Sequence, residues 1–178
     1  MTTIAYKDGW LAADTLLNMV GMKRYGGKIT RHKDATGKEY LVASAGNLSD
    51  CAALEEWYNN GAIGVPQYHL FKDDTPSASM LVVHEEGWVL YVDVYGHESS
   101  IIPDDHFAIG SGSMVAMGAM LAGASAIRAV EIAAIVDPNT GGAVDWQTVA
   151  PRYPTTADEH QHASDQRHKE EQRYHQPA

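Results

Sequence analysis

The sequence is poor in positive charge and almost free of cysteine. Its 178 residues hold 13 Lys and Arg against 23 Asp and Glu, a formal net charge of −10 at pH 7. This charge repels phosphate backbones and anionic membrane surfaces, so we expect neither nucleic acid nor a membrane as a partner. The single Cys51 cannot form an intramolecular disulfide, which is typical of a reducing compartment.

Long hydrophobic runs are also missing. No apolar stretch approaches the roughly twenty residues of a membrane-spanning helix. The first residues lack the basic and then apolar pattern of a secretion signal. We therefore expect a cytoplasmic protein.

The motifs of several common enzyme classes are absent. AIGSGSM does not fit G-x-S-x-G, and it fails G-x-G-x-x-G because Val115 stands where the third glycine belongs. HEEGW at His84 lacks the second histidine of H-E-x-x-H, and one cysteine cannot build a Cys-rich zinc site. His160 and His162 lie in a polar segment, where solvated histidines are the ordinary interpretation. We predict no metal and no cofactor.

The remaining pattern predicts an antiparallel α+β protein. Asp8-Gly9 is a strong hairpin dipeptide between strand-like runs at 2–7 and 10–14. Further hairpins are predicted at 25–46 and 80–96, and single strands at 106–113 and within 137–150. Helical patterns cover 49–61, with Ser49 as the expected cap, and 113–124 and 125–136. This order favours a four-layer αββα sandwich of two antiparallel sheets between helical layers.

Composition divides the chain into two parts. Residues 151–178 contain no Ile, Leu, Val, Phe or Met, so they cannot add much to a core. We predict one domain over 1–150, followed by a polar, histidine-containing tail over 151–178 that is flexible or contacts a partner.

The start of the chain, MTTIAYKDG, carries a candidate nucleophile. If Met1 is removed, Thr2 has a free α-amine beside its own hydroxyl, so one residue supplies both nucleophile and base. The unperturbed pKa of an α-amine is about 7.7–8.0, which suits a general base near neutral pH. If Met1 stays, Thr2 is an ordinary threonine.

Several ordered segments strengthen this interpretation: TTIAYKDG, LAADT, GGKI, ASAGNLSD, AIGSGS and DPNTGGAVD. With them, the chain resembles the β-type subunits of proteasomes and the peptidase ring of the bacterial two-component ATP-dependent protease, especially their short versions in bacterial and phage genomes. These are N-terminal-nucleophile (Ntn) hydrolases. The resemblance implies their fold and the cytoplasm of a bacterial cell, or of a host that expresses a phage gene.

The resemblance also implies roles for individual residues. Thr2 matches the nucleophile, Asp14 the acidic residue near it, Lys28 the active-site lysine and Gly46 the oxyanion position. A Lys–Asp pair beside the terminus makes physical sense, because the cation lowers the proton affinity of the threonine hydroxyl and the carboxylate holds the lysine.

A second group matches the residues that support the terminal amine: Ser111, Asp137 and Thr140. The pocket for the substrate side chain before the scissile bond is predicted, from positions around Lys28 and Gly46, to include Gly26, Ser44 and Leu48. Leu48 predicts a modest apolar preference.

The first functional hypothesis is therefore a threonine-type peptidase that cleaves unfolded polypeptides. By resemblance, its subunits form a homo-oligomeric ring fed by an ATP-driven unfoldase. The alternatives are a catalytically silent assembly or structural module with the same fold and a retained Met1, and an amidase that acts on small molecules.

Overall fold

The computed structural model describes residues 2–19, 22–69, 75–101 and 105–149. Met1 and the predicted tail 151–178 lie outside the described residues. Eleven strands and three helices are found within the described ranges.

One sheet has four antiparallel strands in the order β10-β1-β2-β11. The strands are β1 (Thr3–Lys7), β2 (Trp10–Asp14), β10 (Phe107–Gly110) and β11 (Val144–Thr148). Asp8 and Gly9 both have positive φ, 52° and 80°, as a two-residue turn between twisted strands requires. The first predicted hairpin is therefore confirmed, and it places β1 in the middle of this sheet.

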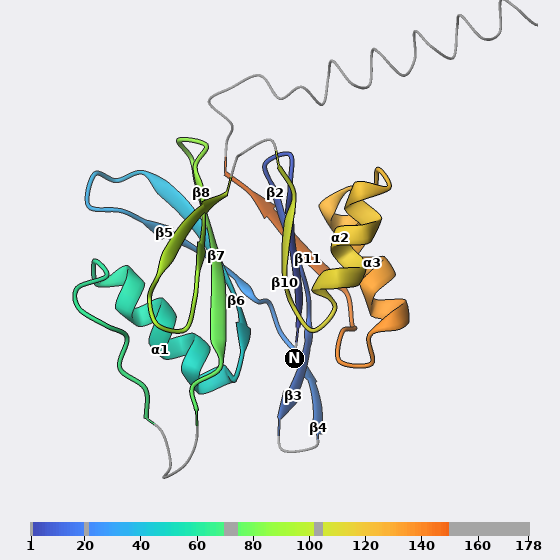
Figure 1. Ribbon diagram of the computed structural model, residues 1–178, viewed down its shortest axis with the longest axis horizontal. Helices are drawn as coiled ribbons and strands as arrows, with labels where there is room; N and C mark the ends of the chain where they lie inside the picture. The colour runs from blue at the N-terminus through green and yellow to red at the C-terminus, as the bar shows by residue number, and fades with distance from the viewer. Residues whose placement is uncertain (1, 20–21, 70–74, 102–104, 150–178) are drawn as a thin grey trace, which may run out of the picture.

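The second sheet has five antiparallel strands in sequence order. They are β5 (Ile29–Lys33), β6 (Glu39–Gly46), β7 (Ala78–His84), β8 (Val89–Val92) and β9 (Glu98–Ile101). A separate hairpin, β3 (Leu16–Met19) with β4 (Met22–Tyr25), extends beyond the two sheets (Figure 1).

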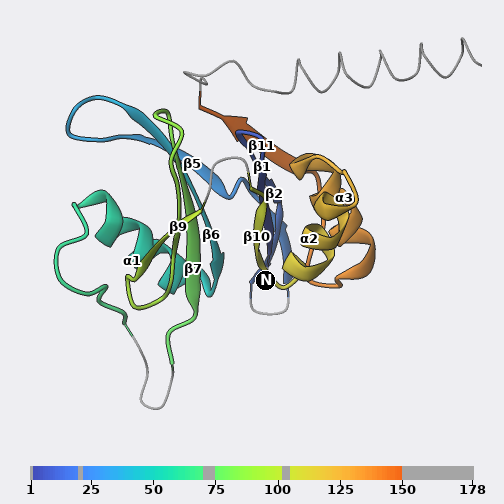
Figure 2. The ribbon, with the colours of Figure 1, turned by 45° about the horizontal axis from the view of Figure 1, so that its top comes forward.

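The helices cover the outer faces of the sheets, as Figure 2 shows. Helix α1 (Leu48–Asn59) lies on the five-stranded sheet, where Leu54 packs with Val42 and Val82. Helices α2 (Ser113–Leu121) and α3 (Ala126–Val136) lie on the four-stranded sheet, against alanines of β1, β2 and β10.

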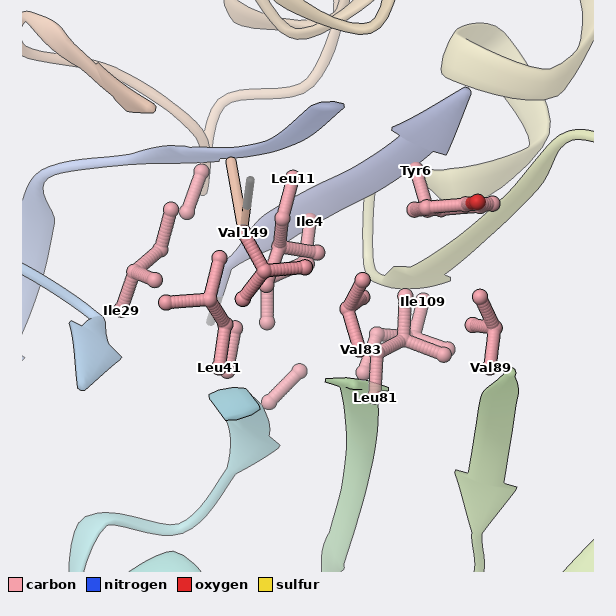
Figure 3. Close-up of a cluster of buried hydrophobic side chains, with 13 residues drawn as sticks. Ile4, Tyr6, Leu11, Ile29, Leu41, Leu81, Val83, Val89, Ile109 and Val149 are labelled. Carbon is pink, nitrogen blue, oxygen red and sulfur yellow. The ribbon is translucent and has the colours of Figure 1, made fainter. Parts of the chain in front are cut away.

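The main core lies between the two sheets (Figure 3). Ile4 and Leu11 of the four-stranded sheet meet Leu41 and Leu81 of the five-stranded sheet, and all four side chains are fully buried. Each such side chain stabilises the fold by about 1.5–3 kcal/mol. Because successive strand residues point to opposite faces, Ala5, next to Ile4, faces the helices instead.

The predicted antiparallel α+β class, with three helices, is confirmed. The expected cap of the first helix is wrong, because α1 begins at Leu48 with Asn47 as its N-cap and no side-chain cap bond. The hairpin β3–β4 and strand β9 were not predicted. No helix in the described part of the chain is long and apolar enough to cross a membrane.

Candidate active site

The predicted catalytic residues come from six separate places in the fold. Thr2 precedes β1, Asp14 ends β2, Lys28 precedes β5 and Gly46 ends β6. The last three, Ser111, Asp137 and Thr140, lie in the loops that follow β10 and α3. The structure brings these places together where the N-terminus lies, at one end of the paired sheets (Figure 1).

Lys28 bridges the candidate nucleophile and the acidic residue. Its Nζ donates to Thr2 Oγ1 at 2.6 Å and to Asp14 Oδ1 at 2.8 Å. Thr2 is 6% exposed, Lys28 8% and Asp14 1%, so this chain of bonds is shielded from solvent. Charge-assisted hydrogen bonds in such surroundings are strong and fix the side chains in place.

Asp14 organises the backbone around the site. Its Oδ1 also accepts from the Thr3 N–H at 2.9 Å. Its Oδ2 accepts from the N–H groups of Leu16 at 3.2 Å and Gly141 at 3.0 Å. One buried carboxylate therefore ties together the N-terminal strand, the start of β3, the loop after α3 and the lysine.

Burial and pairing act in opposite directions on Lys28. Burial lowers the pKa of its ammonium below the ordinary value of 10.5, while the hydrogen bond and charge of Asp14 oppose this change. A charged ammonium beside Thr2 Oγ1 stabilises the alkoxide that forms when the hydroxyl loses its proton.

A second polar network lies beside the first. Asp137 Oδ2 accepts from Ser111 Oγ at 2.6 Å and from Thr140 Oγ1 at 2.7 Å. Ser111 Oγ also lies 3.4 Å from the Thr2 carbonyl oxygen, which can share the single hydroxyl proton only weakly. Partial burial opposes ionisation of Asp137, but these hydroxyl bonds and those from Asn139 outweigh it and lower the pKa of its carboxyl.

Thr3 joins the two networks, a role that the sequence analysis missed. It is fully buried, its N–H is held by Asp14, and its Oγ1 lies 2.6 Å from Thr140 Oγ1. Gly112 packs against the same hydroxyls, because a Cβ there would overlap Thr3 Oγ1 and lie 3.1 Å from Thr140 Oγ1. The signal available in the sequence was the pair of glycines in GSG, which a simple tight turn also explains.

Gly46 has a conformation that favours glycine. Its φ is +148°, and a Cβ would overlap the backbone carbonyl of Ser77 on the neighbouring chain segment. Gly110 likewise has φ +94°, and a Cβ there would overlap the Thr2 carbonyl oxygen. Both ends of the site are thus built by close approach of backbone to backbone.

Two cavities meet at Thr2 and Gly46. The larger, of about 710 Å³, extends toward α1, and the smaller, of about 440 Å³, extends toward Gly110 and Ser111. Because both residues line both cavities, Thr2 and Gly46 lie at the boundary between the two spaces.

The predicted substrate pocket corresponds to the larger cavity. Ser44 and Leu48 line it, whereas Gly26 does not, and its neighbour Gly27 does. Gly26 instead donates its N–H to the Thr15 carbonyl. The walls also include Leu16, Leu17, Cys51, Ala52 and Glu55, none of which the sequence analysis placed there.

Cys51 is a wall residue rather than a second nucleophile. Burial raises the pKa of its thiol to about 11, so the thiol is neutral at pH 7. Across residues 2–19, 22–69, 75–101 and 105–149, no group of His, Cys, Asp and Glu side chains is arranged to hold a metal ion.

Comparison with known proteins shows the fold. No protein family model matches the chain, and no curated protein matches it. Among solved structures, eukaryotic HslV from Trypanosoma brucei is similar, with a TM-score of 0.59 and 20% identity over 82% of this chain and 97% of that one. BPH from Thiobacillus denitrificans has a TM-score of 0.59 and 24% identity over 84% and 98%.

Two further structures extend the comparison. BPH has also been solved in complex with epoxomicin, and that structure has a TM-score of 0.56 and 23% identity over 84% of this chain and 99% of that one. A Gly-1 mutant of Anbu from Hyphomicrobium sp. strain MC1 covers 98% of this chain and 96% of its own, with a TM-score of 0.64 and 13% identity. These likenesses show that the chain shares its fold with HslV, BPH and Anbu.

Proposed function

We propose that the chain is a threonine-type endopeptidase, with the four-layer sandwich of an Ntn hydrolase and Thr2 as its nucleophile after removal of Met1. The observation that carries the proposal is the buried bridge of Lys28 Nζ to Thr2 Oγ1 and Asp14 Oδ1, on the wall of a 710 Å³ cavity. Lys28 thereby holds a cation within hydrogen-bond distance of the hydroxyl that would act as the nucleophile.

In the proposed reaction, Thr2 Oγ1 attacks the peptide carbonyl carbon and the α-amine of Thr2 takes the hydroxyl proton. The C–N bond then breaks, and the same proton passes to the leaving amine. Water hydrolyses the resulting ester, which restores the hydroxyl and releases the carboxylic acid. Lys28 holds its charge beside Oγ1 throughout.

The remaining residues have supporting roles in this proposal. Gly46 N–H donates to the oxyanion of the tetrahedral intermediate, because the backbone at the end of β6 lines both cavities where they meet. Ser111, Asp137 and Thr140 orient the terminal amine, since their network reaches the Thr2 carbonyl through Ser111 Oγ.

Intact-mass measurement of the purified full chain tests the proposal. We expect loss of the Met1 mass and, after incubation with epoxomicin, a further increase of one inhibitor mass located on Thr2 by peptide mapping. Epoxomicin is chosen because one structure of similar fold contains it. A chain that keeps Met1 and takes up no inhibitor would contradict the peptidase and favour the silent assembly module.

We also propose that subunits of this chain form a ring, which an ATP-driven unfoldase supplies with polypeptide. Met114, Leu121, Ile135 and Val136 remain exposed on α2 and α3, and such apolar surface favours contact with another subunit. Light scattering should give a particle well above 19.4 kDa for the full chain and for a chain ending at Ala150. If only the shortened chain is a monomer, residues 151–178 are the assembly element, which would contradict a ring formed through the helices of the 1–150 domain.

A further inference from the structure

The larger cavity has a carboxylate in its wall. Helix α1 presents Leu48, Cys51, Ala52 and Glu55 to the cavity, at the spacings of three and four residues that share one helix face. Glu55 is therefore directed to the same space as Thr2 and Lys28.

Glu55 is held by a hydrogen bond and not by a cation. Ser44 Oγ, on β6 two residues before Gly46, donates to Glu55 Oε1. Within the part of the chain that the structure describes, no Lys, Arg or His forms an ion pair with Glu55. Lys28, the cation of the same cavity, is already paired with Asp14.

The cavity wall combines polar residues, such as Thr30 and Ser49, with apolar ones. Leu16, Leu17, Leu48 and Ala52 can pack against a chain of methylene groups. These apolar residues, together with a carboxylate that has no cationic partner in the described residues, match the side chains of Lys and Arg, which combine an aliphatic stem with a cationic end. An acidic side chain would be repelled by Glu55, and a short apolar one would leave the carboxylate without a counter-charge.

We propose that this cavity selects peptides with a basic side chain directly before the scissile bond, with Glu55 as its counter-ion and Ser44 as the residue that positions Glu55. This inference rests on the proposed peptidase function and replaces the apolar preference that Leu48 alone predicted. The inference rests on the packing of α1 over β6, which brings Glu55 and Ser44 together.

Binding of matched peptides tests the selection without requiring hydrolysis. We would titrate the full chain with acetyl-Ala-Ala-Arg amide, its citrulline analogue and its leucine analogue. Citrulline has nearly the shape of arginine but no charge. We expect the arginine peptide to bind about tenfold more tightly than the citrulline peptide, as a charged hydrogen bond to a partly buried carboxylate allows.

Two variants test whether the preference for the arginine peptide depends on Glu55. Glu55→Gln keeps an oxygen acceptor for Ser44 but removes the charge, so the arginine and citrulline peptides should bind equally well. Glu56→Gln removes a charge from the next residue of α1, which is exposed and does not line the cavity, and should keep the preference. Equal binding of the arginine and citrulline peptides to the unmodified chain would overturn the inference, and that comparison needs no variant to fold.

Hydrolysis separates this inference from the proposed function. The same peptides carrying a fluorogenic leaving group should show the arginine-to-leucine ratio of kcat/KM falling about tenfold in Glu55→Gln. Cleavage with no preference for basic side chains would contradict the proposed selection but would still support the proposed peptidase function. No cleavage of any peptide, with binding of arginine that depends on Glu55, would overturn the peptidase and support the cation site.

Discussion

The two sheets meet their helices in different ways. The four-stranded sheet presents alanines, Ala5, Ala12 and Ala108, to α2 and α3, which bury small side chains of their own against them. The five-stranded sheet presents larger side chains to α1, which buries only Cys51 and Leu54 among its apolar residues. Small residues allow α2 and α3 to approach the four-stranded sheet closely. Helix α1, by contrast, packs on the five-stranded sheet with part of its surface and lines the larger cavity with another part.

The two sides of the proposed site also contribute different residues. Thr3 and Asp14 belong to the closely packed four-stranded sheet, and Thr2 directly precedes its strand β1. Ser44, Gly46 and the cavity-lining face of α1 belong to the other side, and Lys28 connects the two. We therefore expect changes on the first side, and at the oxyanion residue Gly46, to reduce the reaction for every substrate. Changes at Ser44 and on the cavity-lining face of α1 should alter which substrate is used.

Removal of the nucleophile is the strongest test of the four-stranded side. Thr2→Ala should reduce hydrolysis of all peptides by at least about 10³-fold, because no other residue supplies the attacking oxygen. The free energy of unfolding should change little, since the variant loses only a small side chain and one hydrogen bond from Lys28. Thr2→Ser is the matched control and should retain activity. An active Thr2→Ala enzyme would contradict the mechanism.

The connecting lysine should affect both activity and stability. Lys28→Met leaves Asp14 buried without its cation, which costs about 3 kcal/mol of unfolding free energy. Adding Asp14→Asn should cost less than the sum of the two single changes, because both remove the same interaction. Denaturant titration measures each value. Lys28→Arg should not restore hydrolysis, since a guanidinium differs from an ammonium in shape and hydration.

An exposed lysine provides the control for this measurement. Lys33 lies on β5 with a distant partner, Glu39, at 4.0 Å, and its side chain is 66% exposed. Lys33→Met should change stability by less than about 0.5 kcal/mol. Equal effects of Lys28→Met and Lys33→Met would show that Lys28 is an ordinary surface lysine.

Gly37 and Gly46, in the β5–β6 hairpin, both have positive φ, but only at Gly46 would an added Cβ meet other atoms. Comparing the two therefore distinguishes backbone strain from a steric clash. Gly46→Ala introduces a Cβ that overlaps the Ser77 carbonyl at φ +148°, whereas Gly37→Ala meets no atom within 4 Å at φ +85°. We expect a loss of about 2 kcal/mol for the first and about 1 kcal/mol for the second. Hydrolysis should fall only in Gly46→Ala, and equal loss of activity in both would argue against an oxyanion role for Gly46.

The order of strands and helices could largely be read from the sequence. Clear hairpin turns such as Asp8-Gly9 and the alternation of apolar residues mark the strands that build the main core. The hairpin β3–β4 was missed because Leu16 and Leu17 are adjacent and apolar, and β4, Met22–Tyr25, is exposed at every residue, so neither strand alternates. Strand β9, with the sequence ESSI, has a single apolar residue.

The site was predictable where its residues occur in ordered motifs and not where only packing brings them together. Thr2, Asp14 and Lys28 could be assigned by resemblance. The bond between Ser44 and Glu55 depends on how α1 lies over β6, and the choice between Gly26 and Gly27 depends on which residue faces the cavity. The role of Thr3 depends on Thr140, which is 137 residues away in the chain.

The smallest expected effect concerns the end of the five-stranded sheet opposite to Gly46. Asp34, in the β5–β6 turn, accepts hydrogen bonds from the Thr36 hydroxyl and from the N–H groups of Lys38 and Thr36, and it faces His84 Nε2 at 3.3 Å. The Thr36 hydroxyl above all, with the other donors, lowers the pKa of its carboxyl from 3.8 to about 2, against a smaller opposing effect of desolvation.

A lowered carboxyl pKa stabilises the fold above the unfolded value of 3.8, and this contribution is lost as pH falls from 3.8 toward 2. Asp34→Asn keeps the side-chain oxygen and removes the charge, so its melting temperature should lie slightly below that of the unmodified chain at pH 7, and the gap should close between pH 4 and pH 2. Peptide hydrolysis at pH 7 should be the same in both, because this turn contacts neither cavity at Thr2. A gap that stays constant down to pH 2 would mean that the turn is stabilised by shape alone, and a loss of hydrolysis would mean that the far end of this sheet does influence substrate binding.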